Sequence, residues 1–477
     1  MEKIFLIPGM TGSRLGLTLN SPDVWPPTVE EMIWGYDRID ELLDPKLIAT
    51  GIWVESEIIP GWNFPAYKPL IEKLWQIAQD IGDAELVIFP YDWRADIWKS
   101  TAPVLAKEIE KQVDAGASSI TLVCHSMGSL VARLVLESQK YQAASWFSKI
   151  QRLICICGPH LGAPKALGRA LGCESRSLGL EPDDWRSVAN DPRYPAGFQL
   201  FPVPGRETLL DVSSSPSQPV DIYAEGERYG LTKSSLNAAQ ESWKKLKIGA
   251  RPVSVQYVFI AGVGIETSNA YLFDDLRYVE TINVDGDGTV PLWSARPSGS
   301  IKTYVMPAEH VDILGSVQLS QTLDQIFGLP MISAFAREAP GVTINVNKDT
   351  FASNEMMQVL ILPDAPTSNL NGYLTLSNIP IPKRGEAHEI LPRAVGMAVQ
   401  YNGPEISRLS VRVAAPQNPG AYILKFEGAT HQSTEASSVT FFVSAPSKMS
   451  MRPSAPNAEK PRRAQKQRKG AKKKRKK

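Results

Sequence analysis

The chain of 477 residues has only four cysteines and no long hydrophobic run. Four thiols are too few for a secreted disulfide scaffold, and they lack the paired CxxC or histidine spacings of a zinc site. No apolar run approaches the roughly 18 residues that a membrane-spanning helix needs. The first apolar run ends at Pro8-Gly9, which favours a first strand over a signal peptide. We therefore expect a cytoplasmic protein with free thiols, no bound metal and no cofactor. The cysteines are Cys124, Cys155, Cys157 and Cys173.

Acidic and basic residues are nearly balanced overall but unevenly distributed. The formal net charge is +1, yet residues 460–477 contain 12 Lys and Arg and no acid, so subtracting these 12 charges leaves −11 for residues 1–459. A basic segment of this kind favours anionic surfaces. It has no aromatic residues for base stacking, so we expect no specific nucleic-acid binding. Peripheral contact with an anionic membrane is the partner that it suggests.

Short β-branched runs alternate with helical patterns over the first two thirds of the chain. The expected strands are apolar on both faces, as in the interior of a parallel sheet. This repetition predicts an α/β fold with a doubly wound sheet. The predicted strands are Lys3–Ile7, Glu85–Phe89, Ser119–Val123, Arg152–Ile156 and Val253–Ile260, and the predicted helices are Tyr67–Ile81, Ala102–Val113 and Gly128–Lys140.

Two later stretches break this pattern. Residues from about 173 to 250 are rich in Pro, Ser and Gly and have no clean strand period, which is typical of a lid inserted in a catalytic domain. Residues 336–445 contain alternating apolar segments separated by turns, which predicts a small antiparallel β-sandwich of the immunoglobulin-like kind. The predicted division is a catalytic domain at 1–335, the sandwich at 336–445 and a disordered basic tail at 446–477.

Aromatic residues gather after the first predicted strand. Trp25, Trp34, Trp53 and Trp62 fit two interpretations equally, a buried cap core or a surface that enters a membrane interface. Farther along, Asp92 and Arg94 favour a structural ion pair, because charged side chains are seldom buried without a partner.

A strand that runs directly into a helix through His125-Ser126-Met127-Gly128 indicates a nucleophile elbow. Such a turn projects a serine hydroxyl from the carboxyl edge of the sheet. Cys124 stands where glycine is usual, which is a departure from the pattern. The alternative is that Ser126 only caps the following helix.

An elbow of this kind needs an acid and then a histidine later in the chain. Of the five histidines, His310 lies in a loop after a late predicted strand, where this fold places its base. His125 adjoins the nucleophile and should point off the opposite side of the turn. His160 precedes the acid, while His388 and His431 fall in the predicted sandwich.

The acid lies in Val284-Asp-Gly-Asp-Gly-Thr-Val-Pro291, where glycines flank two aspartates. Asp287 is the preferred residue and Asp285 the alternative. A calcium loop is excluded because no glutamate stands at the twelfth position. The predicted triad is therefore Ser126, Asp287 and His310, with backbone N–H donors for the oxyanion at Met127 and, in the loop after the first strand, at Met10.

The motifs together resemble the lecithin:cholesterol acyltransferase family, which includes lysosomal phospholipase A2 and phospholipid:diacylglycerol acyltransferases. The similar segments occur in family order over about residues 4–315. The resemblance implies the catalytic roles given above and a lid over an acyl pocket. The family's early disulfide-pinned segment has no counterpart, since residues 15–66 contain no cysteine. The segments are Ile7–Arg14, Pro90–Arg94, His125–Gly128, Leu161–Pro164, Asp285–Val290 and Glu309-His310.

The resemblance implies an O-acyltransferase or lipase that forms an acyl-serine from a phospholipid or other acyl ester and passes the acyl group to an alcohol or to water. Two alternatives stay open. One is an esterase or thioesterase for soluble acyl substrates. The other is an inactive hydrolase scaffold that binds a partner.

Overall fold

The computed structural model describes residues 1–59, 62–297, 301–330, 341–363, 365–379, 395–428 and 437–446. The side chains of residues 58, 59, 62, 63 and 395 are not described. The basic tail, and with it the expectation of disorder, lies outside these residues. So do His388 and His431.

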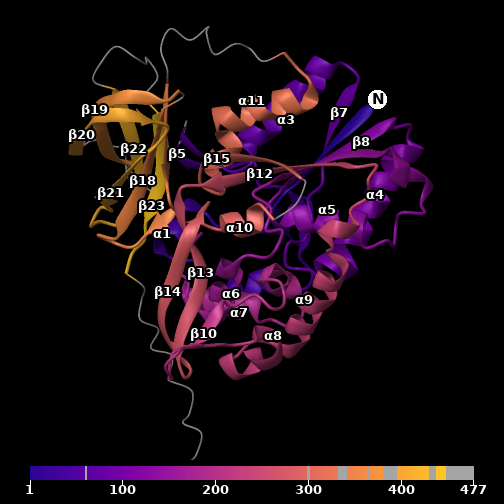
Figure 1. Ribbon diagram of the computed structural model, residues 1–477, viewed down its shortest axis with the longest axis horizontal. Coiled ribbons are helices and arrows are strands. Elements are labelled where there is room, and N and C mark those ends of the chain that lie inside the picture. The colour runs from indigo at the N-terminus through magenta and orange to yellow at the C-terminus, as the bar shows by residue number, and fades with distance from the viewer. Residues whose placement is uncertain are drawn as a thin grey trace, which may run out of the picture. The chain divides into compact units, whose positions relative to one another are not determined.

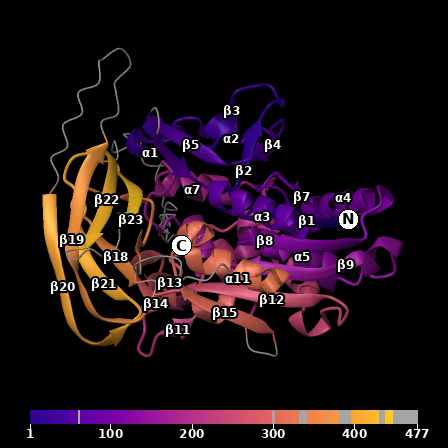
Figure 2. The same ribbon diagram turned by 90° about the horizontal axis from the view of Figure 1, so that it is seen from above.

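Six parallel strands form the central sheet, in the order β15-β12-β9-β8-β1-β7 (Figures 1 and 2). Each predicted strand of the sheet is present, with bounds that shift by a few residues. The prediction of an α/β fold is therefore confirmed. The strands are β1 (Glu2–Ile7), β7 (Ala84–Ile88), β8 (Ser119–His125), β9 (Ile150–Ile156), β12 (Gln256–Val263) and β15 (Lys302–Pro307).

Alternate residues of the sheet supply two separate cores. Phe5 and Leu122 pack in one core with side chains of α4 (Ala102–Asp114) and α5 (Met127–Glu137). Ile4 and Val123 pack in the other with α3 (Lys68–Ile81) and α11 (Val317–Phe327). Because successive strand residues point to opposite faces, the apolar runs of the sequence cover both faces.

Small elements between β1 and α3 form a cap of their own. Strands β2, β3 and β4 make a three-stranded sheet, and β5 pairs with β6. Trp25 and Trp53 are buried in contact with each other, whereas the Trp34 side chain is 61% exposed. The cap interpretation is thus correct for two of the tryptophans. The elements are β2 (Ser13–Gly16), β3 (Asp23–Trp25), α1 (Val29–Trp34), α2 (Ile39–Leu42), β4 (Ile48–Ile52), β5 (Glu55–Ile59) and β6 (Trp62–Pro65).

The stretch between β9 and β15 is mainly helical, with one long hairpin of β13 and β14 that the sequence did not predict. The hairpin pairs with β10, which lies within the predicted lid. The elements are α6 (Pro164–Leu171), α7 (Pro182–Ala189), β10 (Leu209–Asp211), β11 (Gln218–Pro219), α8 (Ile222–Glu225), α9 (Lys233–Lys245), β13 (Ile265–Asp274), β14 (Arg277–Gly286) and α10 (Leu292–Ala295). Short 3₁₀ or π turns lie at Ile97–Thr101, Ser145–Lys149, Pro195–Leu200, Gly226–Tyr229, Ile248–Ala250 and Asp312–Gly315.

Strands after residue 341 form two further sheets, β16-β18-β21 and β17-β23-β22-β19-β20. Their apolar side chains share one core. All pairs are antiparallel except the short parallel pair β17·β23, which differs from the predicted purely antiparallel arrangement. The strands are β16 (Val342–Val346), β17 (Thr350–Phe351), β18 (Met356–Pro363), β19 (Thr367–Ile379), β20 (Val395–Ile406), β21 (Leu409–Ala414), β22 (Gly420–Gly428) and β23 (Ser437–Val443).

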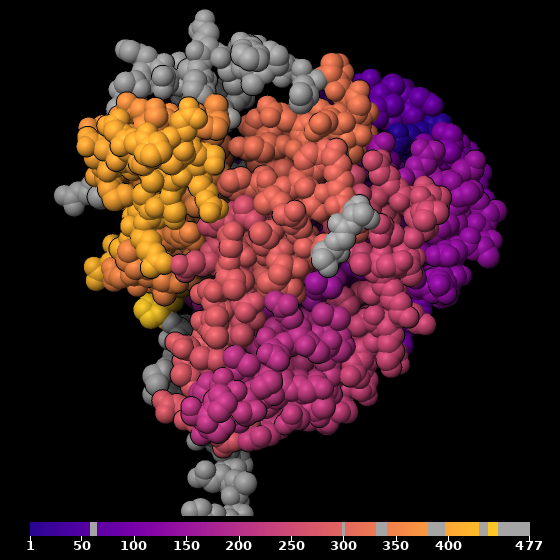
Figure 3. Space-filling view, viewed as in Figure 1, coloured from indigo at the N-terminus to yellow at the C-terminus, as the bar shows by residue number. Residues whose placement is uncertain are grey.

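These C-terminal strands pack directly against the α/β part, and Figure 3 shows them in orange and yellow beside it. Residues 1–445 form one compact unit. Ile265 of β13 shares an apolar cluster with Leu360 and Leu362 of β18. Elsewhere along this contact, the Ala445 N–H donates to the Ile33 carbonyl at 3.0 Å. The predicted boundary near residue 335 stays a prediction. In the described residues, no helix has the length and apolar character required to cross a membrane.

Candidate active site

Ser126 stands in a tight turn between β8 and α5. Its backbone has φ 51° and ψ −124°, a conformation that costs energy for a residue with a side chain. Two glycines make the turn possible. A Cβ on Gly128 would lie 2.5 Å from the Ile7 carbonyl oxygen, and one on Gly9 would lie 2.8 Å from the Ser126 Cβ. The Ser126 side chain makes no capping hydrogen bond, so the capping alternative does not describe this turn.

His310 and Asp287 meet beside this turn. The His310 Nδ1 and Asp287 Oδ2 atoms are 2.8 Å apart, and both side chains are buried. The other carboxylate oxygen of Asp287 accepts hydrogen bonds from the N–H groups of Thr289 and Val290, at 2.9 and 2.6 Å. Burial raises the pKa of Asp287, but His310 and these N–H groups together lower it by more. The net pKa therefore lies below its ordinary value. The geometry is that of a carboxylate that orients an imidazole.

Asp285, the alternative acid, points elsewhere. Its carboxylate accepts a hydrogen bond from the Gly264 N–H at 2.6 Å, and the residue is exposed. It therefore ties the end of β14 to the start of β13. In the structure, Asp287 contacts His310 and Asp285 holds the hairpin.

His125 lies closer to the site than the sequence suggested. We expected it to point away from the nucleophile, but it lines the same cavity, and its ring centroid is 4.8 Å from that of His310. Tyr67 Oη lies 2.6 Å from His125 Nδ1, and His125 Nε2 lies 3.0 Å from the His310 carbonyl oxygen. Burial, together with the charge of nearby His310, lowers the pKa of His125 to about 3. The low pKa keeps His125 neutral, and because both of its ring nitrogens already have hydrogen-bond partners it is poorly placed to accept a proton from Ser126.

The two predicted oxyanion donors belong to the two segments that adjoin Ser126, the start of α5 and the loop after β1. Met127 is the first residue of α5, so its N–H has no acceptor within the helix. Met10 lines the cavity and follows Gly9, whose N–H donates to the Tyr67 hydroxyl at 2.7 Å. A second bond, Gly12 N–H to the Gly9 carbonyl at 3.1 Å, closes the loop into a turn. The loop after β1 is thus fixed beside the serine.

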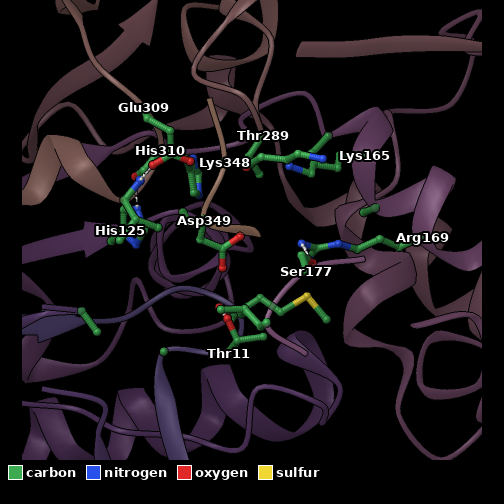
Figure 4. Close-up of a pocket in the computed structure, with 18 of the residues that line it drawn as sticks. Thr11, His125, Lys165, Arg169, Ser177, Thr289, Glu309, His310, Lys348 and Asp349 are labelled. Carbon is green, nitrogen blue, oxygen red and sulfur yellow. Dashed lines mark hydrogen bonds between the residues drawn. The ribbon is translucent and has the colours of Figure 1, made fainter. Parts of the chain in front are cut away.

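Ser126, His125 and His310 all line one cavity of about 590 Å³. Figure 4 shows the two histidines on its wall. This volume is within the usual range for a small-molecule site. Three regions far apart in the sequence build its wall, including the predicted lid and the C-terminal strands. The contribution of the C-terminal strands was not foreseen. Lining residues of the cap are Trp53 and Phe64, those of the predicted lid include Arg176 and Trp185, and those of the C-terminal strands and their loops include Val346, Lys348, Asp349 and Val439.

Two charged residues of α6, Lys165 and Arg169, also line this cavity, and neither was singled out from the sequence. The available signal was their spacing, one helical turn apart just after the Leu161–Pro164 segment. Their side chains project into the cavity opposite His125 and His310 in Figure 4. By contrast, the predicted ion pair is present, since the Arg94 guanidinium contacts both carboxylate oxygens of Asp92 at 2.9 and 2.8 Å.

One set of side chains in the described part of the chain has metal-ligand spacing. Atoms of Cys157, Asp287 and His310 lie within 4.8 Å of one another. Zinc binding requires a thiolate, whereas burial and the nearby Asp287 raise the pKa of Cys157 well above its ordinary value. Asp287 and His310, two of the three groups, are also hydrogen-bonded to each other. All four cysteines are free thiols.

Comparison with known proteins gives one family match. Residues 53–178 match the family model described as lecithin:cholesterol acyltransferase. No curated protein matches the chain. Among solved structures, the Bacillus licheniformis lipase BlEst2 is 10% identical, with a TM-score of 0.34, over 69% of this chain and 92% of that one. The PmoD soluble domain from Methylocystis is 14% identical, with a TM-score of 0.16, over 22% of this chain and 90% of that one.

Proposed function

Because this chain is a protein like those of the lecithin:cholesterol acyltransferase family, with a parallel α/β sheet, we propose that it is a serine-dependent lipid acyltransferase or lipase. Its substrate is a phospholipid or another acyl ester. The observation that carries the proposal is the Asp287–His310 pair, 2.8 Å apart, in which the His310 ring lines the same cavity as a serine held at φ 51°.

In the proposed reaction, the Ser126 oxygen attacks the carbonyl carbon of the acyl ester while His310 Nε2 takes the hydroxyl proton. Asp287 holds the proton on His310 Nδ1 and stabilises the imidazolium. The N–H groups of Met10 and Met127 stabilise the oxyanion. The alcohol then leaves with the proton from His310, and an acyl-serine stays on the enzyme. A second alcohol or water repeats the same steps in reverse order and releases the acyl group.

Two other functions compete with this proposal. A soluble esterase or thioesterase would use the same residues, but the cavity favours a lipid because aromatic side chains of the cap line it. An inactive binding scaffold would have no need for the strained Ser126 backbone or for a buried carboxylate aligned with His310.

The test is labelling with a fluorophosphonate probe, which reacts with activated serines. We expect the wild type to be labelled and Ser126→Ala to lose labelling and esterase turnover. Ser129→Ala is the matched control, since Ser129 is a buried serine one turn along the same segment. Labelling that survives in Ser126→Ala would exclude Ser126 as the nucleophile. Activity of the wild type on long-chain against short soluble esters separates a lipase from a soluble esterase.

Two regions outside the triad complete the proposal. Residues from about 173 to 250 act as a lid, which is supported by the side chains that this stretch contributes to the cavity wall. The basic segment 460–477 attaches a cytoplasmic enzyme peripherally to anionic membrane, at about 1 kcal/mol for each engaged residue. A protein that ends at Glu459 should then lose flotation with anionic liposomes yet keep its turnover of a short soluble ester.

A further inference from the structure

Lys165 and Arg169 occupy successive turns of α6 on the wall of the catalytic cavity. The contacts of their charged ends in the described structure are with uncharged groups. Lys165 Nζ donates to the Gly288 carbonyl at 2.8 Å. Arg169 donates to the Ser177 hydroxyl at 3.2 Å, and its guanidinium stacks over the Trp185 ring at 4.2 Å.

Other enclosed cations of this chain have carboxylate partners. Arg133 contacts both oxygens of Glu137 at 2.7 and 2.9 Å. Lys348, which lines the same cavity, lies 2.7 Å from a Glu355 oxygen. Within the described ranges, no carboxylate oxygen lies within 4.0 Å of the Lys165 ammonium or the Arg169 guanidinium. Two neighbouring cations without such a partner are costly unless another anion approaches them.

The acidic residues near the two cations either hydrogen-bond to other groups or lie too far away to form an ion pair with them. Glu174 accepts hydrogen bonds from Tyr271 and Ser268. Glu309 accepts from the backbone N–H groups of residues 311 and 312. Asp349 enters the cavity between the two cations and His310 in Figure 4, at a distance too great for an ion pair.

Burial outweighs these acids in its effect on both cations. It lowers the pKa of Lys165 and of Arg169, although Glu174 and Asp349 act in the opposite direction. Each side chain keeps some accessible surface, because each faces the hollow of the cavity while protein encloses it on the other sides. The accessible surface of both cations thus faces the space where a substrate would enter.

We propose that Lys165 and Arg169 form a subsite for an anionic group, a phosphate or a carboxylate, carried by the acyl substrate or product. This inference rests on the proposed function, since it takes the cavity as the acyl-binding site. Arginine presents planar N–H donors that match two oxygens of such a group, and lysine adds a point charge beside it. When the anionic group binds, the charge on Lys165 and the charge on Arg169 each gain a charge-assisted hydrogen bond that the empty cavity does not provide. The site would therefore select anionic acyl compounds over neutral ones.

The test measures binding alone, by isothermal titration calorimetry on Ser126→Ala protein, which turns over no ester. Dihexanoyl phosphatidic acid is compared with dihexanoylglycerol, and octanoate with octanol, all below their micellar concentrations. Each pair differs in the anionic group. We expect the anionic member of at least one pair to bind roughly 10–100-fold more tightly, the usual effect of hydrogen bonds to a charged group. Preference within the first pair identifies phosphate as the ligand group, and preference within the second identifies carboxylate.

Substitutions locate the preference in these two residues. Lys165→Gln with Arg169→Gln should abolish it, while the conservative pair Lys165→Arg with Arg169→Lys should keep most of it. Lys348→Gln controls for a cation of the same cavity, and Lys107→Gln controls for net charge at an exposed position of α4. Both controls should leave the preference unchanged. A melting curve shows that the double variant is folded, and removal of two unpaired charges should not destabilise it.

Equal binding within both pairs, or a preference that survives the double variant, would overturn the subsite. Because the protein used for binding lacks Ser126, the measured preference is independent of turnover. Wild-type protein that neither hydrolyses any of the esters nor transfers their acyl groups to an alcohol, but whose Ser126→Ala form prefers the anion, would refute the proposed function and leave the subsite standing.

Discussion

The two histidine rings beside Ser126 are 4.8 Å apart, yet their surroundings differ completely. A buried carboxylate, Asp287, approaches the Nδ1 atom of His310, which stabilises a positive charge on the ring. His125 contacts a phenol and a carbonyl instead, and burial lowers its pKa to about 3. The carboxylate therefore distinguishes a ring whose positive charge would have a partner from one that stays neutral. Proximity to the serine does not distinguish the two rings.

The same substitution at both rings should separate these roles most strongly. His310→Gln should lower kcat by roughly four to six orders of magnitude, because it removes the base and leaves Ser126 without a proton acceptor. His125→Gln keeps a donor and an acceptor for its two contacts and should cost about tenfold or less. The measurement is turnover of one short soluble ester by both variants.

Circular dichroism of both variants provides the control for folding. Losses of similar size in the two variants would remove the distinction between the rings. The base would then have to be assigned to the pair rather than to His310.

A second comparison sharpens the role of the carboxylate. Asp287→Asn should lower kcat by about three to four orders of magnitude, because an amide can hold His310 in the wrong tautomer. Asp285→Asn should cost far less, since the Asp285 carboxylate is hydrogen-bonded to the Gly264 N–H and is not in contact with His310. The two aspartates lie in the same loop, so each variant is the control of the other. The opposite ranking would assign the orienting role to Asp285.

Local sequence was enough to find the parts of the site that follow from the strand order. The elbow at Ser126, the aspartate loop and the loop of His310 each come directly after a strand or hairpin of the fold. The central strands were predictable because their apolar runs are buried on both faces. Strand β20 (Val395–Ile406) was missed, since its Asn, Gly and Pro residues interrupt any alternation.

Contacts between distant segments could not be predicted. Nothing near Tyr67 in the sequence indicates that its hydroxyl would meet both Gly9 and His125. The meeting depends on how the start of α3 packs against the loop after β1. Likewise, Lys165 and Arg169 could be read as ordinary helical charges, because their lack of carboxylate partners is a property of the folded cavity.

The low pKa of His125 predicts a stability effect that separates it from a surface histidine. Unfolding restores its pKa from about 3 to 6.5, so the unfolded chain binds more protons between these values. The contribution of His125 to stability is complete above pH 6.5 and is lost as the pH falls toward 3. Between pH 7 and pH 4.5, wild-type protein should lose about 2–3 kcal/mol more unfolding free energy than His125→Gln. Urea titrations at the two pH values measure this difference, and parallel losses would contradict the neutral buried ring.

The smallest expected effect tests the link between the two rings and the loop after β1, which carries the proposed oxyanion donor Met10. The Tyr67 hydroxyl accepts the Gly9 N–H at 2.7 Å and lies 2.6 Å from His125 Nδ1, to which it can donate. Burial raises the pKa of Tyr67, so the phenol keeps its proton, and His125 then carries its own proton on Nε2, directed at the His310 carbonyl.

Tyr67→Phe leaves the Gly9 N–H and a ring nitrogen of His125 unpaired, which should lower stability by about 1–3 kcal/mol. Because Gly9 precedes the proposed donor Met10, we also expect kcat to fall roughly tenfold, which corresponds to a rise of about 1.4 kcal/mol in the activation free energy. Tyr304→Phe is the matched control, since the Tyr304 hydroxyl makes one exposed hydrogen bond to Gln325 and should matter to neither measurement. If Tyr67→Phe lost stability but kept full turnover, the phenol would support only the packing of this region, and the loop after β1 would be held in place without it.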